Sequence, residues 1–258
     1  MPVRFACLTG VAPGTDLAAQ CAAIAAAGCL GVETLLFERA DLGAWQAEMR
    51  QAAGNVGLEI ASVILGGLAL YQPGQEAWLA EAIHAVGELG GGVLMTPEYR
   101  PQDPLPIFPP YPAPSPAEIE QVAQALAVVD QAARLHHVPV FLEPLTAFEG
   151  RFWRDVAAVQ QVCEAFANPW MGLALDFHNM NITEANLVAT IVRAGKWVRH
   201  VHLADNNRRL PGTGHIDFRA GVAALHTIGY DGWYSFECAV DGDFAPALRH
   251  VQAWLATA

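Results

Sequence analysis

The sequence predicts a single (β/α)₈ TIM barrel, and three observations carry this prediction. The chain has 258 residues, close to the roughly 250 residues that such a barrel needs. Short hydrophobic runs of strand length alternate with helical patterns along the whole chain, which is typical of a parallel sheet with crossover helices. Eight such units can be counted, so we expect one barrel domain over residues 1–258.

The predicted strands are short apolar runs, and several of them follow a glycine. A glycine at that place suits the left-handed residue that ends a helix and turns the chain back into the barrel. In chain order we expect strands at Arg4–Leu8, Gly31–Leu36, Glu59–Leu65, Gly92–Thr96, Val138–Glu143, Gly172–Asp176, Val198–His202 and Trp233–Glu237.

Helical patterns separate these strands, for example over residues 15–28, 75–90, 117–136 and 154–166. A doubly wound open sheet is the alternative fold. It usually has a glycine-rich, nucleotide-binding turn after its first strand, and the sequence lacks one there. The closed barrel is therefore favoured.

A proline-rich segment at residues 101–116, PQDPLPIFPPYPAPSP, interrupts the repeating pattern. It follows the fourth predicted strand and should lie on the rim where the carboxyl ends of the strands meet. Long loops in compact domains often cover binding sites, so Phe108 and Tyr111 are candidate lid residues. A surface linker without functional consequence is the alternative interpretation.

The composition narrows the class of protein. With 53% hydrophobic and 16% charged residues the chain should be globular and not disordered. Its net charge of −12 and the lack of a basic cluster disfavour nucleic acid as a partner, because binding to phosphates relies on Lys and Arg.

The five cysteines form no CxxC pair, and we interpret them as buried thiols in a reducing compartment. The first residues lack the apolar core of a signal peptide, and no apolar run approaches the ~20 residues of a membrane span. We therefore expect a cytoplasmic protein without a membrane partner.

Four predicted strands in the second half of the chain end in a side chain that can bind a metal: Glu143, Asp176, His202 and Glu237. In a closed parallel barrel these ends meet at one pocket. Three carboxylates and one imidazole suit a divalent ion that prefers oxygen ligands. The alternative is that each carboxylate only caps the helix that follows it.

Other chemistries find little support. The single lysine, Lys196, precedes the seventh predicted strand on the opposite rim, which excludes a Schiff-base aldolase. No GxSxG motif is present, which disfavours serine hydrolysis. The sequence PGTGH at 211–215 lacks the lysine of a phosphate loop and is interpreted as a tight turn at the pocket rim.

Four segments, LEPLTAFE at 142–149, LALDFHNMNITE at 173–184, HVHLADNNRRLPGTGHIDF at 200–218 and IGYDGWYSFE at 228–237, together resemble the xylose isomerase-like TIM barrels. Within that fold they resemble the sugar (phosphate) isomerase and epimerase family, which includes ketose 3-epimerases and hydroxypyruvate isomerase. The resemblance is close in the second half of the chain and architectural in the first half.

The resemblance implies one Mn²⁺, Mg²⁺ or Co²⁺ ion held by the four strand-end residues. It also implies that Glu143 and Glu237 are the catalytic acid and base. Glu149 matches a carboxylate that hydrogen-bonds the sugar, and Arg208 matches an arginine that contacts substrate oxygens.

Two departures from the family pattern concern substrate contacts. The family places a histidine three residues after the strand-six aspartate, whereas this chain has His178 two residues after it and Asn179 at the third place. Either residue is a candidate contact. Thr146 and Ala147 replace the Asn and Arg of the common EPLNRxE motif. His215, on the same rim, is a further candidate for substrate contact.

The sequence thus predicts a metal-dependent isomerase or epimerase of a small sugar or hydroxy-keto acid, which moves protons through an ene-diolate. A metal-dependent dehydratase of a keto-polyol would use the same ligands. A nuclease similar to endonuclease IV needs further histidines after strands three and four, where the chain reads ILGGLA and TPEYR. A sugar-binding barrel without catalysis is the non-enzyme alternative. A homo-oligomer is possible.

Overall fold

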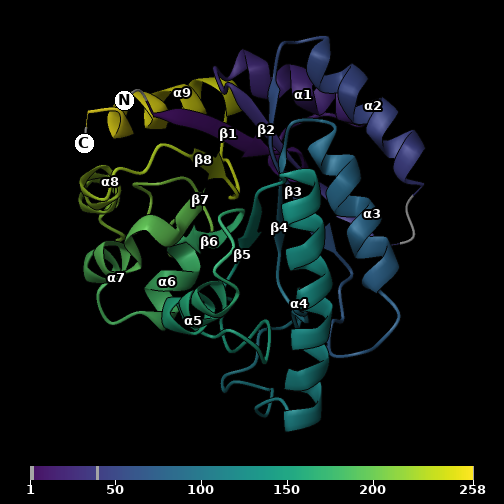
Figure 1. The fold of residues 1–258 in the computed structure, drawn as a ribbon. Helices are drawn as coiled ribbons and strands as arrows, with labels where there is room; N and C mark the ends of the chain where they lie inside the picture. Colours follow the sequence, from purple (N-terminus) through teal and green to yellow (C-terminus); the bar gives the residue numbers. More distant parts are fainter. Residues whose placement is uncertain (1–2, 39–40, 258) are drawn as a thin grey trace.

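The computed structural model describes residues 3–38 and 41–257 and shows a closed barrel of parallel strands wrapped by helices (Figure 1). Each strand pairs with its neighbours in chain order, and β1 pairs with β8 to close the barrel. The described strands are β1 (Arg4–Leu8), β2 (Gly31–Phe37), β3 (Glu59–Gly66), β4 (Gly92–Met95), β5 (Val140–Leu142), β6 (Met171–Asp176), β7 (Val198–Leu203) and β8 (Trp233–Phe236). The predicted fold class is confirmed.

Helices connect the strands on the outside of the barrel. They are α1 (Leu17–Ala26), α2 (Leu42–Gly54), α3 (Glu76–Gly87), α4 (Pro116–His136), α5 (Val156–Phe166), α6 (Phe177–Thr183), α7 (Leu187–Ala194), α8 (Phe218–Thr227) and α9 (Phe244–Leu255), with short 3₁₀ turns η1 (Thr9–Val11) and η2 (Gly195–Trp197). Aspartates before several helices accept a hydrogen bond from the backbone N–H three residues later, which stabilises the helix start; these are Asp16, Asp41, Asp155 and Asp217.

Inward side chains fill the barrel in layers. Ala6, Ala61 and Trp233 pack together toward the amino ends of the strands, and Leu94, Phe141 and Ala174 form a second apolar cluster above them. The main hydrophobic core lies between the outer face of the sheet and the helices. The packed lower interior leaves space for a ligand toward the carboxyl ends of the strands.

All five cysteines are free and buried, as expected for small apolar side chains. Burial raises the pKa of Cys21 to about 11 and that of Cys163 to about 12, so their thiols stay protonated at neutral pH. Within residues 3–38 and 41–257, no helix combines the length and the hydrophobicity needed to cross a membrane.

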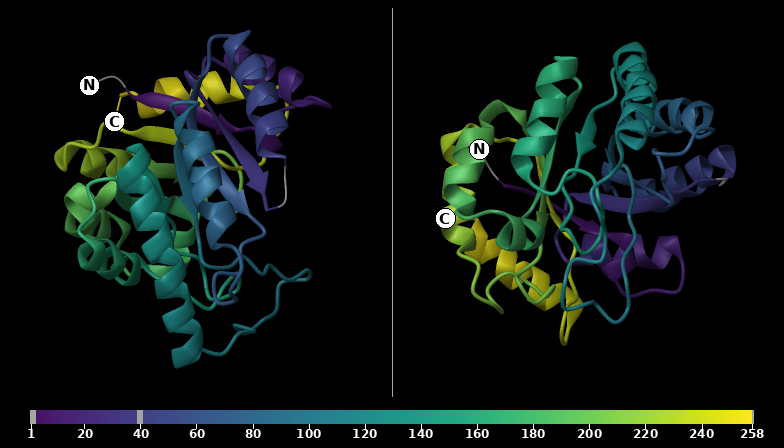
Figure 2. Two further views of the ribbon diagram at one scale, coloured as in Figure 1. Left: turned by 45° about the vertical axis from the view of Figure 1, so that its right-hand side comes forward. Right: turned by 90° about the horizontal axis from the view of Figure 1, so that it is seen from below.

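The proline-rich connection runs from the end of β4 to the start of α4 and extends away from the barrel (Figure 2, left). Its last residue, Pro116, is already the first residue of α4, where a proline is well tolerated. Ser115 and Glu118 bond each other's backbone N–H groups in a capping box.

Arg151, between β5 and α5, holds both ends of this connection. Its Nε lies 3.0 Å from Oε1 of Glu98, which follows β4, and its Nη1 lies 2.6 Å from Oε1 of Glu118 in the first turn of α4. The Glu98 side chain is only 1% exposed. Its buried charge therefore depends on the guanidinium for compensation.

Replacing Arg151 by methionine should lower the free energy of unfolding by about 3–5 kcal/mol, because the buried carboxylate of Glu98 would lose its partner. Denaturant titration followed by circular dichroism measures the change. Arg209→Met is the control, since its ion pair with Asp241 is exposed and should contribute less than about 1 kcal/mol. Equally small changes in both variants would contradict the dependence of Glu98 on Arg151.

Candidate metal and substrate site

The carboxyl ends of β5 to β8 bring the predicted ligands to one level of the barrel. Asp176 is the last residue of β6 and pairs in register with His202 of β7. Glu143 and Glu237 come directly after β5 and β8, and their backbone N–H groups donate to Met95 and Leu203 of the preceding strands. The sheet hydrogen bonds thus continue one residue past each strand and fix where the two glutamates start.

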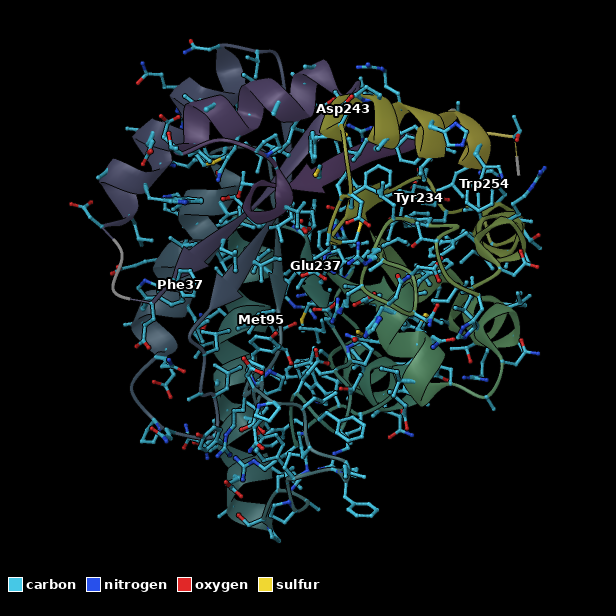
Figure 3. All side chains as sticks on the ribbon, turned by 180° about the vertical axis from the view of Figure 1, so that it is seen from behind. Phe37, Met95, Tyr234, Glu237, Asp243 and Trp254 are labelled. Atoms are coloured by element: carbon cyan, nitrogen blue, oxygen red, sulfur yellow. The ribbon has the colours of Figure 1, made fainter. Side chains whose placement is uncertain are left out.

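Glu143, Asp176, His202 and Glu237 gather closely enough to hold a metal ion. One ligand atom from each of them lies within 4.8 Å of the others. His202 Nδ1 lies 3.2 Å from Oε1 of Glu143 and 3.2 Å from Oε2 of Glu237. Glu237 lies near the centre of the molecule in the view of Figure 3. The convergence expected from the strand ends is therefore present in the structure.

The pKa values of these groups are shifted by burial and crowding. Burial raises the pKa of Glu143 to about 7; His202 opposes the shift, and the carboxylates of Glu237 and Asp176 add to it. Burial also raises the pKa of Asp176, against the effect of Arg208. Burial alone would raise the pKa of Glu237, but His202 and Arg208 bring it below its usual value.

These residues fit a divalent cation on the chemistry of the donor set. Three carboxylates lie close together, two of them buried and that of Glu237 partly exposed, and their mutual repulsion is only partly balanced by the imidazole and by Arg208. A divalent ion at their centre would remove this repulsion. The three oxygen donors and one nitrogen donor suit Mn²⁺, Mg²⁺ or Co²⁺ better than a thiolate-seeking metal.

Arg208 links the acidic side chains across the mouth. Its Nη1 lies 3.0 Å from Asp176 Oδ2 and 3.3 Å from Glu237 Oε2, while its Nη2 lies 3.2 Å from Glu149 Oε1 and 3.3 Å from Asn179 Oδ1. Its backbone has a φ of 57°, which is uncommon for a residue with a side chain. The loop around it must therefore hold this conformation.

Asp205 organises that loop. Its buried carboxylate accepts hydrogen bonds from the backbone N–H groups of Asn206, Gly212, Gly214 and Ile216. A side chain at Gly214 would collide with the Asp205 carboxylate and with the Asn206 amide. The PGTGH segment is a tight turn at the rim, as the sequence indicated. Its hydrogen bonds to Asp205 fix the backbone of the loop that carries Arg208.

Glu33 of β2 is a buried residue beside the site that the motifs did not reveal. Its carboxylate lies 2.8 Å from His200 Nε2 and 3.0 Å from His202 Nε2, and it also accepts a hydrogen bond from the Ser62 hydroxyl. An imidazole that bonds a carboxylate through one nitrogen is held in orientation and presents the other nitrogen. Nδ1 of His202 consequently faces Glu143 and Glu237. The sequence signal that could have revealed Glu33 is a glutamate at an inward-facing position within an apolar strand.

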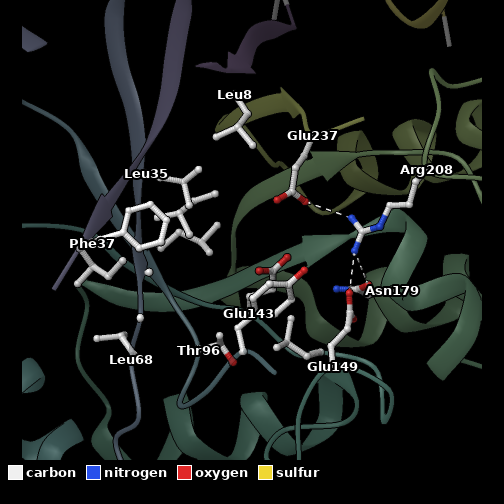
Figure 4. A pocket seen from close by; sticks show the side chains of 17 residues that line it. Leu8, Leu35, Phe37, Leu68, Thr96, Glu143, Glu149, Asn179, Arg208 and Glu237 are labelled. Carbon is white, nitrogen blue, oxygen red and sulfur yellow. Dashed lines mark hydrogen bonds and ion pairs between the residues drawn. The ribbon is translucent and has the colours of Figure 1, made fainter. Parts of the chain in front are cut away.

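Two of the four predicted ligands, Glu143 and Glu237, border a cavity of about 330 Å³ (Figure 4). Glu143, Glu237, Arg208, Asn179 and Glu149 line one side of it. Asp176 and His202 are buried and lie outside its lining. The cavity opens next to the acidic cluster, so a bound molecule would contact the glutamates and Arg208.

Of the predicted substrate contacts, Glu149 and Asn179 lie in the cavity wall, while His178 and His215 do not. His178 Nδ1 lies 3.0 Å from the backbone oxygen of Asp205. His215 is exposed and bonds Asn181 at a separate hollow on the surface. The structure thus places Asn179, and not His178, against the cavity.

The proposed lid residues also lie outside the cavity lining. Phe108 is 78% exposed. The guanidinium carbon of Arg100 lies 4.9 Å from the centre of the Tyr111 ring. The aromatic side chains in the cavity wall are those of Phe37 and Tyr99, among the described residues. The lid role of Phe108 and Tyr111 stays a prediction.

A family model described as "Xylose isomerase-like TIM barrel" matches residues 21–258. The chain belongs to this family. The prediction made from the motifs of the second half is confirmed, and the match includes most of the first half as well.

Relatives of this xylose isomerase-like barrel include two epimerases. A 3-dehydro-D-guloside 4-epimerase of Escherichia coli is 32% identical over 139 residues, which are 54% of this chain and 53% of that protein. A ketose 3-epimerase of Arthrobacter globiformis is 32% identical over 124 residues, 48% of this chain and 43% of the relative. The matched segments span about half the length of these relatives.

Solved structures show the same fold. A 3-keto-D-glucoside 4-epimerase from E. coli superposes with a TM-score of 0.85 at 23% identity, covering 99% of this chain and all of that one. An L-ribulose 3-epimerase superposes with a TM-score of 0.81 at 24% identity, covering 99% of this chain and 94% of that chain.

Replacing Gly214 by alanine should lower the free energy of unfolding by about 1–3 kcal/mol, because the new methyl group overlaps the Asp205 carboxylate. Gly54→Ala is a matched control in helix α2, where an added methyl group meets nothing within 4 Å. That substitution should raise stability by about 0.5–1 kcal/mol. Denaturation curves that shift in the same direction for both variants would contradict the close packing of the loop.

Proposed function

We propose that this chain is a divalent-metal-dependent epimerase of a keto sugar. Three findings support the proposal. They are the family, the names of its relatives, and a group of residues beside a cavity that could hold a metal ion. One observation carries it: Glu143, after β5, and Glu237, after β8, both line the polar side of the cavity with their carboxylates toward each other, and Arg208 lies beside Glu237 (Figure 4). Two facing carboxylates are what inversion at one carbon requires, since a proton leaves one face and another arrives at the opposite face.

Glu143, Asp176, His202 and Glu237 would hold the ion. When bound there, a divalent ion supplies Lewis acidity, which makes a C–H bond next to a carbonyl more acidic. The identity of the metal is part of the proposal, and the donor set favours Mn²⁺, Mg²⁺ or Co²⁺.

The proton transfers fall to the two glutamates. One carboxylate removes the proton from the carbon beside the carbonyl, and the electron pair of that C–H bond moves toward the carbonyl oxygen. The other carboxylate, as its acid form, returns a proton to the same carbon from the other face. The C–H bond broken and the C–H bond formed balance, so no oxidant or reductant is needed.

The neighbouring polar groups position the sugar. Arg208 presents its guanidinium to the cavity, where it can bind oxygens that become negative during the reaction. Glu149 and Asn179 hold that guanidinium in place through its Nη2 and remain able to bond sugar hydroxyls. Buried Glu33 keeps the imidazole of His202 oriented from below.

Replacing Asp176 by asparagine should weaken Mn²⁺ binding by at least about 100-fold, because even residues that only support metal ligands contribute 10–100-fold. Calorimetric titration of the metal-free protein with Mn²⁺ measures this. Glu149→Gln is the control, since it removes a cavity carboxylate outside the group of four. Equal Mn²⁺ affinity in wild type and the Asp176 variant would rule out this ligand set.

In deuterated water with Mn²⁺, the protein should exchange one C–H hydrogen of a keto sugar and produce its epimer. Replacing Glu237 by glutamine should lower this rate by about 10²–10⁴-fold, since the base is removed while the shape is kept. Proton NMR follows both exchange and product. Exposed Glu164 on α5 offers a control, because Glu164→Gln leaves the site intact.

The Mn²⁺ affinity of the Glu237 variant must be measured in parallel, because this residue also belongs to the metal set. Retained metal with near-normal exchange would show that Glu237 is not the base. Loss of water from the sugar would indicate a dehydratase, and an aldose product would indicate an isomerase.

A further inference from the structure

The wall of the cavity is divided by polarity along the strand order. The side formed by β5 to β8 and their loops carries the acidic groups, the amide and Arg208 described above. The side formed by β1 to β4 is apolar and includes Leu8, Leu35, Phe37, Ile64, Leu68 and Leu94. Figure 4 shows the two groups facing each other across the cavity, with Phe37 and Leu35 opposite Arg208 and Asn179.

This division follows from the alternation of side chains along each strand. Leu35 and Phe37 share the inward face of β2 with Glu33, because residues two apart in a strand point to the same side. Glu33 lies deeper, beside His200, whereas Phe37 lies at the outer end of β2 (Figure 3). The apolar side is therefore at the same end of the barrel as the acidic residues.

The apolar side is open to a ligand. Leu35 is 36% exposed and Phe37 is 58% exposed, which is high for residues of a central barrel strand. The Phe37 ring packs on the backbone of Gly66, where a side chain would come within 2.7 Å of the ring. Gly66 and Gly67 thus leave space for the ring, and no side chain projects from them into the cavity.

A free ketose suits only half of such a cavity. It carries a hydroxyl group on nearly every carbon, and each hydroxyl that loses water against leucine and phenylalanine without a new partner costs about 1–3 kcal/mol. Among the described lining residues of this side, only Thr96 and Tyr99 carry polar groups. An apolar substituent would instead gain about 25 cal/mol for each Å² that it buries.

We propose that the substrate is a keto sugar linked as a glycoside to an apolar alkyl or aryl group, an inference that rests on the proposed epimerase function. The sugar ring lies between Glu143 and Glu237, with its oxygens toward Arg208. The apolar group lies against Leu35, Phe37 and the other side chains of the β1 to β4 side. The substrate class is thus set by the first half of the barrel and the reaction by the second.

Deuterium exchange tests this with a matched pair of probes, methyl and phenyl 3-keto-β-D-glucopyranoside, with D-fructose as a free ketose. We expect kcat/KM for the phenyl glycoside to exceed that for the methyl glycoside by about tenfold or more, and fructose to be the poorest. Phe37→Ala and Leu35→Asn should each reduce the phenyl-to-methyl ratio by about threefold or more. Circular dichroism verifies that both variants fold.

Leu135→Ala is the matched control, because this exposed side chain on α4 lies outside the cavity and its loss should leave the ratio unchanged. Equal kcat/KM for both glycosides, or ratios unaffected in the Phe37 and Leu35 variants, would overturn the inference while leaving the epimerase proposal intact. Absence of exchange with all three compounds in the presence of Mn²⁺ would instead overturn the proposed function, and this inference with it.

Discussion

Repulsion among three closely spaced carboxylates at one end of the barrel is the constraint on which the rest of the site depends. Glu143, Asp176 and Glu237 lie too close together to be ionised at once without positive charge nearby. Arg208 supplies part of that charge, and a divalent ion held by the cluster would supply the remainder. The surrounding structure serves to keep His202 and Arg208 in place: Glu33 bonds the far side of the imidazole, and the loop tied to Asp205 carries Arg208.

Much of the fold and the acidic cluster followed from the sequence, because both depend on patterns that are local. Strand length, alternating helices and a residue able to bind a metal at the end of each of four strands are visible in the chain itself. Glu33 was not found because its partner His202 lies 169 positions away. A contact of that kind exists only once the barrel is closed, and no spacing in the sequence announces it.

The choice between His178 and Asn179 shows a different limit. Helix α6 begins at Phe177, directly after the predicted ligand Asp176, and successive residues in a helix point about 100° apart. A shift of one residue in where the helix begins would therefore exchange the two side chains. Similarly, the sequence predicts lid residues in the proline-rich segment from their aromatic character alone. The cavity wall instead contains Phe37, which reaches it from the inward face of β2.

Arg151 gives the proline-rich connection a further property. The Arg151 guanidinium binds the carboxylate of Glu98 just before the connection and the carboxylate of Glu118 just after it. The two ends of the connection therefore stay in place whatever lies between them. Doubling the length of a flexible loop costs only about 0.6 kcal/mol once its ends are fixed. The connection is therefore a modular position in the scaffold, where evolution or engineering can exchange whole segments above the mouth without disturbing the strands that carry the chemistry.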